Sequence, residues 1–261
     1  MTRPLPLLVF TDLDGTLLSH EDYDWSPAKP ALDALNEIGA GIVMASSKTA
    51  AEMGPLREAL GLSAWPAICE NGAGILPPQS AAAVEKSDYG EIRAVLEEQL
   101  SKHRQQFRGF GDMTCAEVVE VTGLPKTEAR RAKDRAFSEP GIWSGPEEEK
   151  SAFLAALSEQ GIKAREGGRF LTLSFGQTKA DRMREVIAQF QPRHSIALGD
   201  APNDIEMLET ADVGVIVHNP HRVPLPALTG EAAGRIRRTT QAGPEGWNTA
   251  VLSLLAEFGL R

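Results

Sequence analysis

The chain has few cysteines and no long apolar run, and both absences limit what kind of protein it can be. Only two of its 261 residues are cysteines, Cys69 and Cys115, and they lack the C-x-x-C spacing of a zinc or redox site. Two cysteines are too few for a disulfide framework, so we expect both to be reduced thiols. No stretch approaches the ~18 consecutive apolar residues that would cross a bilayer. We therefore expect a soluble, folded protein without a membrane partner.

Positive charge is also scarce. The chain has 27 Lys and Arg against 36 Asp and Glu, which gives a net charge of −9. Binding to a phosphate backbone needs a basic surface, so nucleic acid and anionic membranes are excluded as main partners. No cleavage site of the signal-peptide type follows the first apolar run, and we expect a cytoplasmic location. An acidic protein can still bind a small phosphorylated molecule if a metal ion and a few cations offset its own field.

Short apolar runs near the N-terminus predict buried strands. They are Leu5–Phe10, Gly41–Ala45 and Pro66–Cys69, and the helical patterns Pro27–Ile38 and Thr49–Leu60 lie between them. Strands that alternate with helices at this interval indicate βαβ units and a parallel sheet.

The same rhythm returns after Lys179. The predicted elements there are helix Ala180–Phe190, strand Ser195–Leu198, helix Asp204–Thr210 and strand Val213–Val217. We therefore predict an α/β protein whose doubly wound, parallel-sheet (Rossmann-like) core comprises residues 1–79 and 177–261.

The middle of the chain, residues 80–176, is more polar and predicts a separate, inserted α+β domain. An alternating segment, Phe170–Phe175, indicates a strand that faces a core on one side. The helical patterns before it are Tyr89–Gln106, Cys115–Thr122, Lys126–Asp134 and Glu147–Gln160.

Two carboxylates follow the first predicted strand, in the motif Asp12-Leu13-Asp14-Gly15-Thr16. Ligands of open α/β sheets bind beyond the carboxyl ends of the strands, so chemistry is expected at this loop. Gly15 permits a sharp turn that lets both carboxylates converge on one point. One can then attack phosphorus while the other gives a proton to the leaving oxygen. Alone, the same pattern is also compatible with a solvated acidic turn.

Further polar groups are expected at the same edge of the sheet. Asp200, in Gly199-Asp200-Ala201-Pro202-Asn203-Asp204, supplies with Asp12 the oxygen ligands that Mg²⁺ prefers, and Asp204 can orient a metal-bound water. Ser46, the amide of Ser47, and Lys179 can donate to phosphoryl oxygens, where fixed donors stabilise developing charge.

As a set, these four elements resemble, in order and spacing, the signature motifs of the haloacid dehalogenase-like phosphatases. The resemblance implies that Asp12 is the nucleophile and that Asp14 is the general acid/base and a metal ligand through its carbonyl. It also implies that Asp200 binds Mg²⁺ and that residues 80–176 form a cap domain that determines substrate specificity. The phosphate-binding residues it implies are Ser46, Ser47, Lys179 and Asn203.

A closer resemblance, to the mannosyl-3-phosphoglycerate phosphatases, extends into the middle domain and implies a phosphorylated sugar acid as substrate and mannosylglycerate as product. The segments that carry it are Val9–Leu18, Ser46–Thr49, Glu70–Ala73, Gly109–Met113, Gly123–Pro125, Ala129–Pro140 and Gly167–Phe170. The approach to the lysine, Phe175–Lys179, has fewer glycines than this family leads us to expect.

Two further groups are candidates for substrate binding. Glu70, Asn71 and Gly72 end the third predicted strand and either contact substrate or form only a glycine-rich turn. Arg165 and Arg169 flank Gly167-Gly168, and a planar guanidinium suits bidentate recognition of a carboxylate. We therefore expect Arg169 to bind the glycerate carboxylate.

Alternatives to this function remain open. The chain could be a phosphatase for another sugar or sugar-acid phosphate, such as glucosyl-3-phosphoglycerate, or a hexose phosphomutase. It could also be an inert sensor of a phosphorylated ligand, although a sensor would be expected to lose Asp12, Asp14, Lys179 or Asp200. The sequence does not indicate an oligomeric state.

Overall fold

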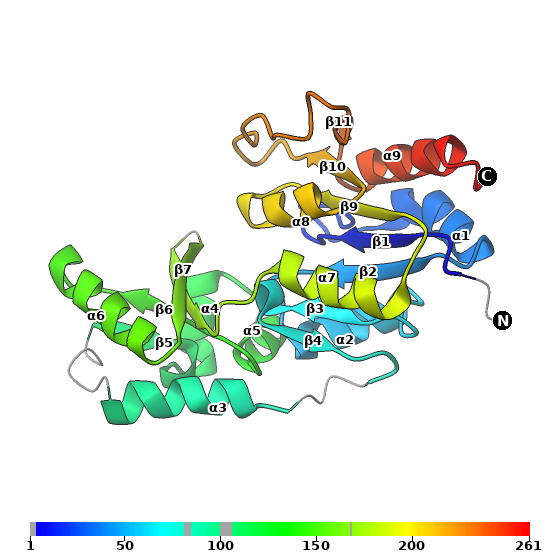
Figure 1. The fold of residues 1–261 in the computed structure, drawn as a ribbon. Helices are drawn as coiled ribbons and strands as arrows, with labels where there is room; N and C mark the ends of the chain where they lie inside the picture. The colour runs from blue at the N-terminus through cyan, green and yellow to red at the C-terminus, as the bar shows by residue number, and fades with distance from the viewer. Residues whose placement is uncertain (1–3, 81–84, 100–105, 168) are drawn as a thin grey trace.

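The computed structural model describes residues 4–80, 85–99, 106–167 and 169–261, and it contains two β-sheets flanked by helices (Figure 1). The larger sheet is built from both ends of the chain and the smaller one from its middle. The predicted α/β class with a Rossmann-like core is confirmed. Among the described residues, no helix combines the length and the apolar composition needed to cross a bilayer.

The larger sheet has seven strands in the order β11-β10-β9-β1-β2-β3-β4. All neighbours pair in parallel except β3 and β4, which are antiparallel. The strands are β1 (Leu8–Thr11), β2 (Gly41–Ala45), β3 (Ala67–Cys69), β4 (Gly74–Leu76), β9 (Ser195–Gly199), β10 (Val213–His218) and β11 (Ile236–Ala242). The strand order reverses direction at β1, so the carboxyl end of β1 is the switch point where such sheets bind ligands.

Both faces of this sheet are covered, which explains why its central strands are apolar throughout. Alternate residues in and just before β1 contribute to two separate cores, Leu7 and Val9 to one and Leu8 and Phe10 to the other. The first core contains helices α1 (Lys29–Glu37), α2 (Ala50–Ala59) and α9 (Gly243–Glu257). The second contains α7 (Lys179–Phe190) and α8 (Ile205–Thr210).

Two helices that follow strands begin at threonine capping boxes. Thr49 Oγ1 accepts from the amide of Glu52, and Thr178 Oγ1 accepts from the amide of Asp181. In return, the amide of each threonine donates to the carboxylate of its acid. A capping box satisfies two backbone donors and fixes where the helix starts. The one at Thr178 therefore makes Lys179 the first residue of α7, at the edge of the sheet.

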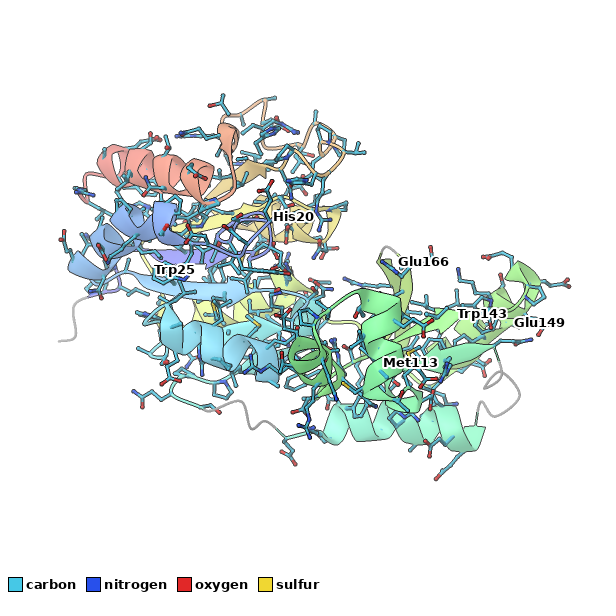
Figure 2. All side chains as sticks on the ribbon, turned by 180° about the vertical axis from the view of Figure 1, so that it is seen from behind. His20, Trp25, Met113, Trp143, Glu149 and Glu166 are labelled. Atoms are coloured by element: carbon cyan, nitrogen blue, oxygen red, sulfur yellow. The ribbon has the colours of Figure 1, made fainter. Side chains whose placement is uncertain are left out.

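The smaller sheet is antiparallel, with four strands in the order β5-β6-β8-β7. Leu171 and Leu173 of β8 point toward one face, where α3 and α6 cover them with Ile92, Phe153 and Leu157. The strands are β5 (Phe107–Gly109), β6 (Glu139–Trp143), β7 (Lys163–Gly167) and β8 (Phe170–Ser174), and the helices are α3 (Ser87–Ala94), α4 (Cys115–Thr122), α5 (Lys126–Lys133) and α6 (Glu147–Glu159). In Figure 2, Trp143 and Glu149 lie at the end of this unit that is remote from the larger sheet.

Several elements differ from those predicted. The single helix predicted over Tyr89–Gln106 is α3 followed by one π-helical turn, Val95–Gln99, and its residues 100–105 lie outside the described part of the chain. Sequence analysis did not identify β4, β5, β6, β7, β11 or α9. β6 contains Pro140 and Gly141, and β7 is mostly exposed, so neither shows the apolar pattern of a buried strand.

Short 3₁₀ turns complete the fold at Ser26–Ala28, Glu70–Gly72, Phe110–Asp112 and Pro202–Asp204. Two of them, Glu70–Gly72 and Pro202–Asp204, follow β3 and β9 directly. Both therefore stand at the carboxyl edge of the larger sheet.

The C-terminal helix α9 is tied to the central strand. Trp247 is fully buried, and its indole nitrogen donates to Thr11 Oγ1 at 3.0 Å. We predict that Trp247→Phe lowers the free energy of unfolding by about 1–3 kcal/mol, because it removes this hydrogen bond and leaves space in the core. Urea unfolding measures this, with Val223→Ala as control, since Val223 is 89% exposed. Equal stability of the two variants would contradict the prediction.

Candidate active site

Asp12 lies directly after β1, at the switch point of the larger sheet. Its amide donates to the Leu198 carbonyl of β9 at 2.9 Å, and Thr11 Oγ1 donates to its carbonyl at 2.7 Å. The same Thr11 oxygen accepts from Trp247. The backbone of Asp12 is therefore held from two sides, and only 8% of the residue is exposed.

Lys179 connects Asp12 to Asp204. Its ammonium donates to Asp12 Oδ1 and to Asp204 Oδ1, each at 2.7 Å, and all three side chains are buried. The other oxygen of Asp204 accepts from the amides of Asp200 and Ala201 at 3.1 and 3.0 Å. Asp204 thus fixes both the lysine and the loop that carries Asp200, in addition to the role toward a metal-bound water predicted from sequence.

Asp200 faces the same cluster from the loop after β9. Its Oδ2 accepts from Asn219 Nδ2 at 2.7 Å and pairs with Arg222 Nε at 3.1 Å, and its Oδ1 accepts from Thr16 at 3.3 Å. Gly15 makes room for this arrangement, because a Cβ there would lie 2.3 Å from Asn219 Nδ2. Its φ of +84° also favours glycine.

The three aspartates form a site whose donors suit a hard divalent cation. One oxygen each from Asp12, Asp200 and Asp204 lies within 4.8 Å of the others. Burial raises the pKa of Asp12 to about 7; Lys179 opposes this, while Asp204 and Asp200 add to it. Burial also raises the pKa of Asp200. Buried carboxylates with too little positive charge around them are what a metal ion would stabilise, so the residues fit Mg²⁺.

Lys179 itself stays charged. Burial disfavours its ammonium, but Asp12 and Asp204 raise its pKa above the usual range. A buried lysine whose charge is secured by two carboxylates can offer its remaining N–H to an anion that enters the site.

Asp14 lies near these groups but belongs to a different ion pair. Its Oδ2 is 2.9 Å from the ammonium of Lys48, which lies 5.1 Å from the ring centroid of Tyr23. Burial opposes the charge of Lys48, yet Asp14 raises its pKa. Asp14 Oδ1 is shielded and has no hydrogen-bond partner among the described residues. A shielded polar oxygen without a partner is one whose hydrogen bond remains to be made, by a ligand or a water.

The predicted phosphate-binding serines follow β2. Ser46 is buried and its Oγ accepts from the amide of Lys48 at 3.3 Å, whereas Ser47 is exposed. The carbonyls of Ser46 and Lys48 accept from the amides of Asn71 and Glu70 at 2.9 and 3.0 Å. The turn after β3 therefore holds the loop after β2 in place.

This turn, Glu70–Gly72, has three consecutive residues with positive φ, of +52°, +59° and +94°. Such backbone is costly outside glycine and persists only where the surroundings fix it. A Cβ on Gly72 would lie 2.1 Å from the carbonyl carbon of Thr178 and 2.3 Å from the amide nitrogen of Lys179. The turn thus packs directly on the start of α7 and determines where Lys179 lies.

In this turn, the side chains of Glu70 and Asn71, which were predicted to bind substrate, form hydrogen bonds to other parts of the protein. The Glu70 carboxylate is buried and accepts from the Ala136 amide at 2.9 Å and from Ser138 Oγ at 2.6 Å, which ties the larger sheet to the segment before β6. This geometry argues against the predicted contact of Glu70 with substrate. Asn71 Oδ1 accepts from Asn203 Nδ2 at 2.9 Å, so two predicted ligand-binding amides are paired with each other at the surface.

Arg165 and Arg169, at the β7–β8 hairpin of the smaller sheet, make no contact with the aspartate cluster among the described residues. Arg165 in β7 and Arg169 between β7 and β8 are both exposed, and Gly168 lies outside the described residues. Arg165 pairs in register with Thr172, which alternates with the buried Leu171 and Leu173. Arg165 therefore points to the sheet face away from α3 and α6. Glu166, labelled in Figure 2, marks the tip of this hairpin.

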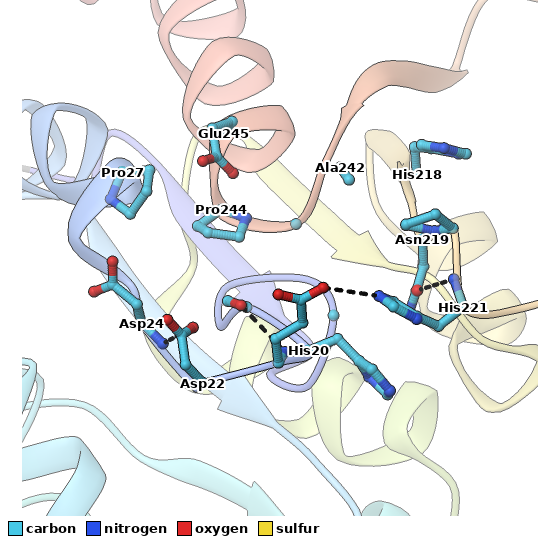
Figure 3. A pocket seen from close by; sticks show the side chains of 15 residues that line it. His20, Asp22, Asp24, Pro27, His218, Asn219, His221, Ala242, Pro244 and Glu245 are labelled. Atoms are coloured by element: carbon cyan, nitrogen blue, oxygen red, sulfur yellow. Dashed lines mark hydrogen bonds and ion pairs between the residues drawn. The ribbon is translucent and has the colours of Figure 1, made fainter.

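A pocket of about 280 Å³ adjoins the aspartate cluster through Gly15 and Asn219 (Figure 3). His20 and His221 stack there with ring centroids 4.5 Å apart, and Glu21 lies 3.9 Å from His221. These side chains are largely exposed, and the pocket lining does not include Asp12, Lys179 or Asp200. The pocket lies beside the cluster and does not contain it.

Sequence analysis did not identify four residues that contact the site: Thr16, Lys48, Asn219 and Arg222. Lys48 is two residues from Ser46, and Thr16 is two residues from Asp14. Their closeness to these predicted site residues is the feature of the sequence that could have identified them. Asn219 and Arg222 follow β10, the next strand after β9 at the same edge of the sheet. A polar residue just past a buried strand was the signal that could have identified Asn219.

We predict that Gly72→Ala destabilises the protein more than Gly39→Ala does. Both glycines have positive φ, +94° and +70°, but a Cβ on Gly39 would meet nothing within 4 Å. Gly39→Ala costs only the backbone strain, roughly 1–2 kcal/mol, whereas Gly72→Ala adds about 1–3 kcal/mol for the collision with Thr178 and Lys179. Urea unfolding of both variants tests this, and equal losses would show that the turn does not constrain α7.

The raised pKa of Asp12 predicts a pH-dependent stability in the absence of metal. Relative to the ordinary value of 3.8, a folded-state pKa of about 7 means that the folded protein binds the proton more tightly than the unfolded chain. The contribution of this tighter proton binding to the free energy of unfolding is fully present below pH 3.8 and is lost as pH rises through about 7. In EDTA, Asp12→Asn should therefore gain stability relative to wild type between pH 5 and pH 8. A difference that does not change with pH would contradict the raised pKa.

Two solved structures illustrate the fold that this chain shares. A phosphatase of the haloalkanoate superfamily from Bacteroides thetaiotaomicron matches at TM-score 0.64 and 20% identity, over 98% of this chain and 96% of that one. The sucrose-phosphatase of Synechocystis sp. PCC6803, solved with sucrose and phosphate, matches at TM-score 0.62 and 16% identity, over 98% of each chain. At these identities the likeness shows the fold alone.

The sequence itself matches one protein family over residues 9–115 and 150–224, which is most of the chain. The matched segments include Asp12, Lys179 and Asp200, whose side chains the structure brings together. The protein belongs to the haloacid dehalogenase-like hydrolases.

Proposed function

We propose that the protein is a Mg²⁺-dependent phosphatase that hydrolyses phosphate monoesters through an aspartyl-phosphate on Asp12. The observation that carries the proposal is the cluster at the carboxyl end of β1. Asp12 has one oxygen fixed by Lys179 at 2.7 Å, and Asp14 holds a shielded oxygen without a partner among the described residues. A fixed nucleophile beside an available proton carrier is the arrangement that a two-step displacement needs.

In the first step, a carboxylate oxygen of Asp12 attacks phosphorus and the bond from phosphorus to the ester oxygen breaks. Asp14 gives its proton to the leaving oxygen, so that the alcohol departs neutral. In the second step, Asp14 takes a proton from water, whose oxygen attacks the phosphorus of the aspartyl-phosphate. The bond to Asp12 breaks, inorganic phosphate leaves, and both aspartates return to their starting states.

The groups that would receive the phosphate surround Asp12. Lys179 has an N–H beyond the two that bond Asp12 and Asp204, and Ser46 and the Ser47 amide stand at the end of the neighbouring strand. Mg²⁺ held by Asp12, Asp200 and the Asp14 carbonyl would offset the negative charge of the phosphate. Asn219 and Arg222 hold Asp200 in position for this role.

We propose that residues 80–176 are a cap over this site and that the core comprises residues 1–79 and 177–261. The antiparallel sheet β5-β6-β8-β7 is built entirely from the inserted residues. Its β7–β8 hairpin carries Arg165 and Arg169, both exposed. We propose that these arginines contact the part of the substrate that is remote from the phosphate.

For the substrate, we propose a phosphorylated sugar acid of the mannosyl-3-phosphoglycerate type, with mannosylglycerate as product. The sequence motifs shared with that family include segments of the inserted unit, among them Gly109–Met113 and Ala129–Pro140. In the structure, Arg93 pairs with Glu139 and Asp112 of these two segments at 2.8 and 2.6 Å, which joins them into one partly buried network. The fold shared with a structure containing sucrose and phosphate supports a sugar-bearing phosphate.

The experiment that tests this function is phosphate release from p-nitrophenyl phosphate and from mannosyl-3-phosphoglycerate. We predict turnover that requires Mg²⁺, stops in EDTA, and disappears in Asp12→Asn, because an amide is a poor nucleophile. Asp14→Asn should lower kcat by about 10²–10⁴-fold, the usual range for general acid–base catalysis. Asp33→Asn, an exposed carboxylate on α1, is the matched control.

Three results would contradict the proposal. Asp12→Asn activity above about a tenth of wild type would exclude the covalent route, since removal of a nucleophile typically costs far more. Binding of phosphorylated sugars without any turnover by wild type would instead indicate a sensor. Isomerisation of a hexose phosphate without release of phosphate would indicate a mutase.

A further inference from the structure

Lys48 is a positively charged residue of the site that has no role in the mechanism proposed above. It lies on the loop after β2, and its ammonium is 2.9 Å from Asp14 Oδ2. The side chain of Lys48 is 18% exposed and that of Asp14 is 31% exposed, so the pair borders the open part of the site. The ring of Tyr23, 5.1 Å away, covers one side of the ammonium.

The two lysines of the site differ in how far their hydrogen-bonding capacity is used. Lys179 donates to two carboxylates and is 1% exposed, so a single N–H remains, which the proposed mechanism gives to the phosphate. Lys48 pairs with one carboxylate and faces the region beside Asp14. An ammonium has three N–H donors, so Lys48 can bind a second anion without releasing Asp14.

The position of Asp14 limits where the leaving group lies. A proton donor must come within about 2.6–3.2 Å of the oxygen that it protonates. Since Lys48 is 2.9 Å from the other oxygen of the same carboxylate, its ammonium lies close to the leaving alcohol. In a 3-phosphoglycerate unit, the carboxylate is two carbon–carbon bonds from the carbon that bears the ester oxygen. Bond lengths of about 1.2–1.5 Å place its oxygens roughly 3–5 Å from that ester oxygen, within reach of Lys48.

We propose that Lys48 binds the carboxylate of the leaving alcohol and so determines the preference for phosphorylated acids, a role that sequence analysis gave to Arg169. The inference rests on the proposed phosphatase function. Lys48 donates one N–H to Asp14 Oδ2 and another to the substrate carboxylate, and it thereby joins the proton donor to the leaving group. Asp14 Oδ1, which is shielded and has no partner among the described residues, is then the oxygen left to carry the proton to the departing oxygen. A substrate without a carboxylate loses one of these two contacts.

The structure favours Lys48 over Arg169 for this role. Arg169 is exposed at the hairpin of the smaller sheet, where the Phe170 ring lies 5.9 Å from its guanidinium carbon. Lys48 is held beside a residue of the reaction by an ion pair and by hydrogen bonds of its backbone to Ser46 and Glu70. A preorganised cation next to the leaving group discriminates better than one on an exposed hairpin.

The test compares two substrates that differ in one group. 3-Phospho-D-glycerate and sn-glycerol 1-phosphate share the primary phosphate ester, the neighbouring hydroxyl and its configuration, but the first has a carboxylate where the second has a hydroxymethyl group. We expect wild type to prefer the first. Lys48→Met should lower kcat/KM for both, because Asp14 loses its partner, and should lower it about 10- to 150-fold more for 3-phosphoglycerate, the value of a charge-assisted hydrogen bond. Lys48→Arg should restore much of the preference, and Arg169→Met should change both substrates by the same factor.

A second measurement covers the case in which Lys48→Met folds poorly. D-glycerate should inhibit hydrolysis of p-nitrophenyl phosphate by wild type more strongly than glycerol does, and Lys48→Gln should abolish that difference.

Equal losses on the two phosphates in Lys48→Met would overturn the inference, as would a wild type without preference for the acid or a selective loss in Arg169→Met. In each of these cases, hydrolysis of p-nitrophenyl phosphate by wild type would leave the phosphatase function standing. If wild type hydrolyses none of the three phosphates, the proposed function fails and the inference fails with it.

Discussion

The buried ammonium of Lys179 is the interaction on which the rest of the site depends. It lies 2.7 Å from both Asp12 and Asp204, and it is the cation that lets three buried aspartates lie within 4.8 Å of one another. Removing such a cation would leave carboxylates buried without compensation, which is costly in any protein interior. Much of the surrounding structure serves to fix this one nitrogen.

Three devices position Lys179. The Thr178 capping box makes it the first residue of α7, and the left-handed turn at Glu70–Gly72 packs against its backbone. Asp204, held by the amides of Asp200 and Ala201, accepts a hydrogen bond from the Lys179 ammonium and fixes its position. Asp12 is fixed independently through Thr11 and Trp247 of α9. The site is thus supported from β1, β3, β9 and the C-terminal helix together, which accounts for strain being tolerated at the turn.

The same turn connects the two halves of the molecule. Glu70 binds the segment before β6 while its amide holds the loop that carries Lys48. Ser46, Lys48 and Lys179 therefore all depend on the path of residues 70–72. Glu70, predicted from sequence to touch substrate, supports three residues proposed to do so.

The sequence predicts those parts of the fold and site that depend on a pattern of neighbouring residues. Asp12, Asp200 and Lys179 were identified because each lies next to a buried apolar strand or a helix start, and a parallel sheet brings such ends together. Strands β1, β2 and β9 carry a clear apolar run, whereas the exposed β7 and the proline-containing β6 do not. The pairing of Lys48 with Asp14 and the burial of Glu70 depend on contacts between segments distant in sequence. No local pattern specifies those contacts, and only the folded arrangement shows them.

If the proposed mechanism holds, the Asp12 carboxylate, held by Lys179, becomes covalently phosphorylated during turnover. Acid quenching of the enzyme during hydrolysis of p-nitrophenyl phosphate, followed by digestion and mass spectrometry, detects this intermediate because acyl phosphates survive longest in acid. We expect one added phosphoryl group on the peptide that contains Asp12, present in wild type and Asp14→Asn and absent in Asp12→Asn. A phosphoryl group on another residue, or none during active turnover by either Asp12-containing protein, would contradict it.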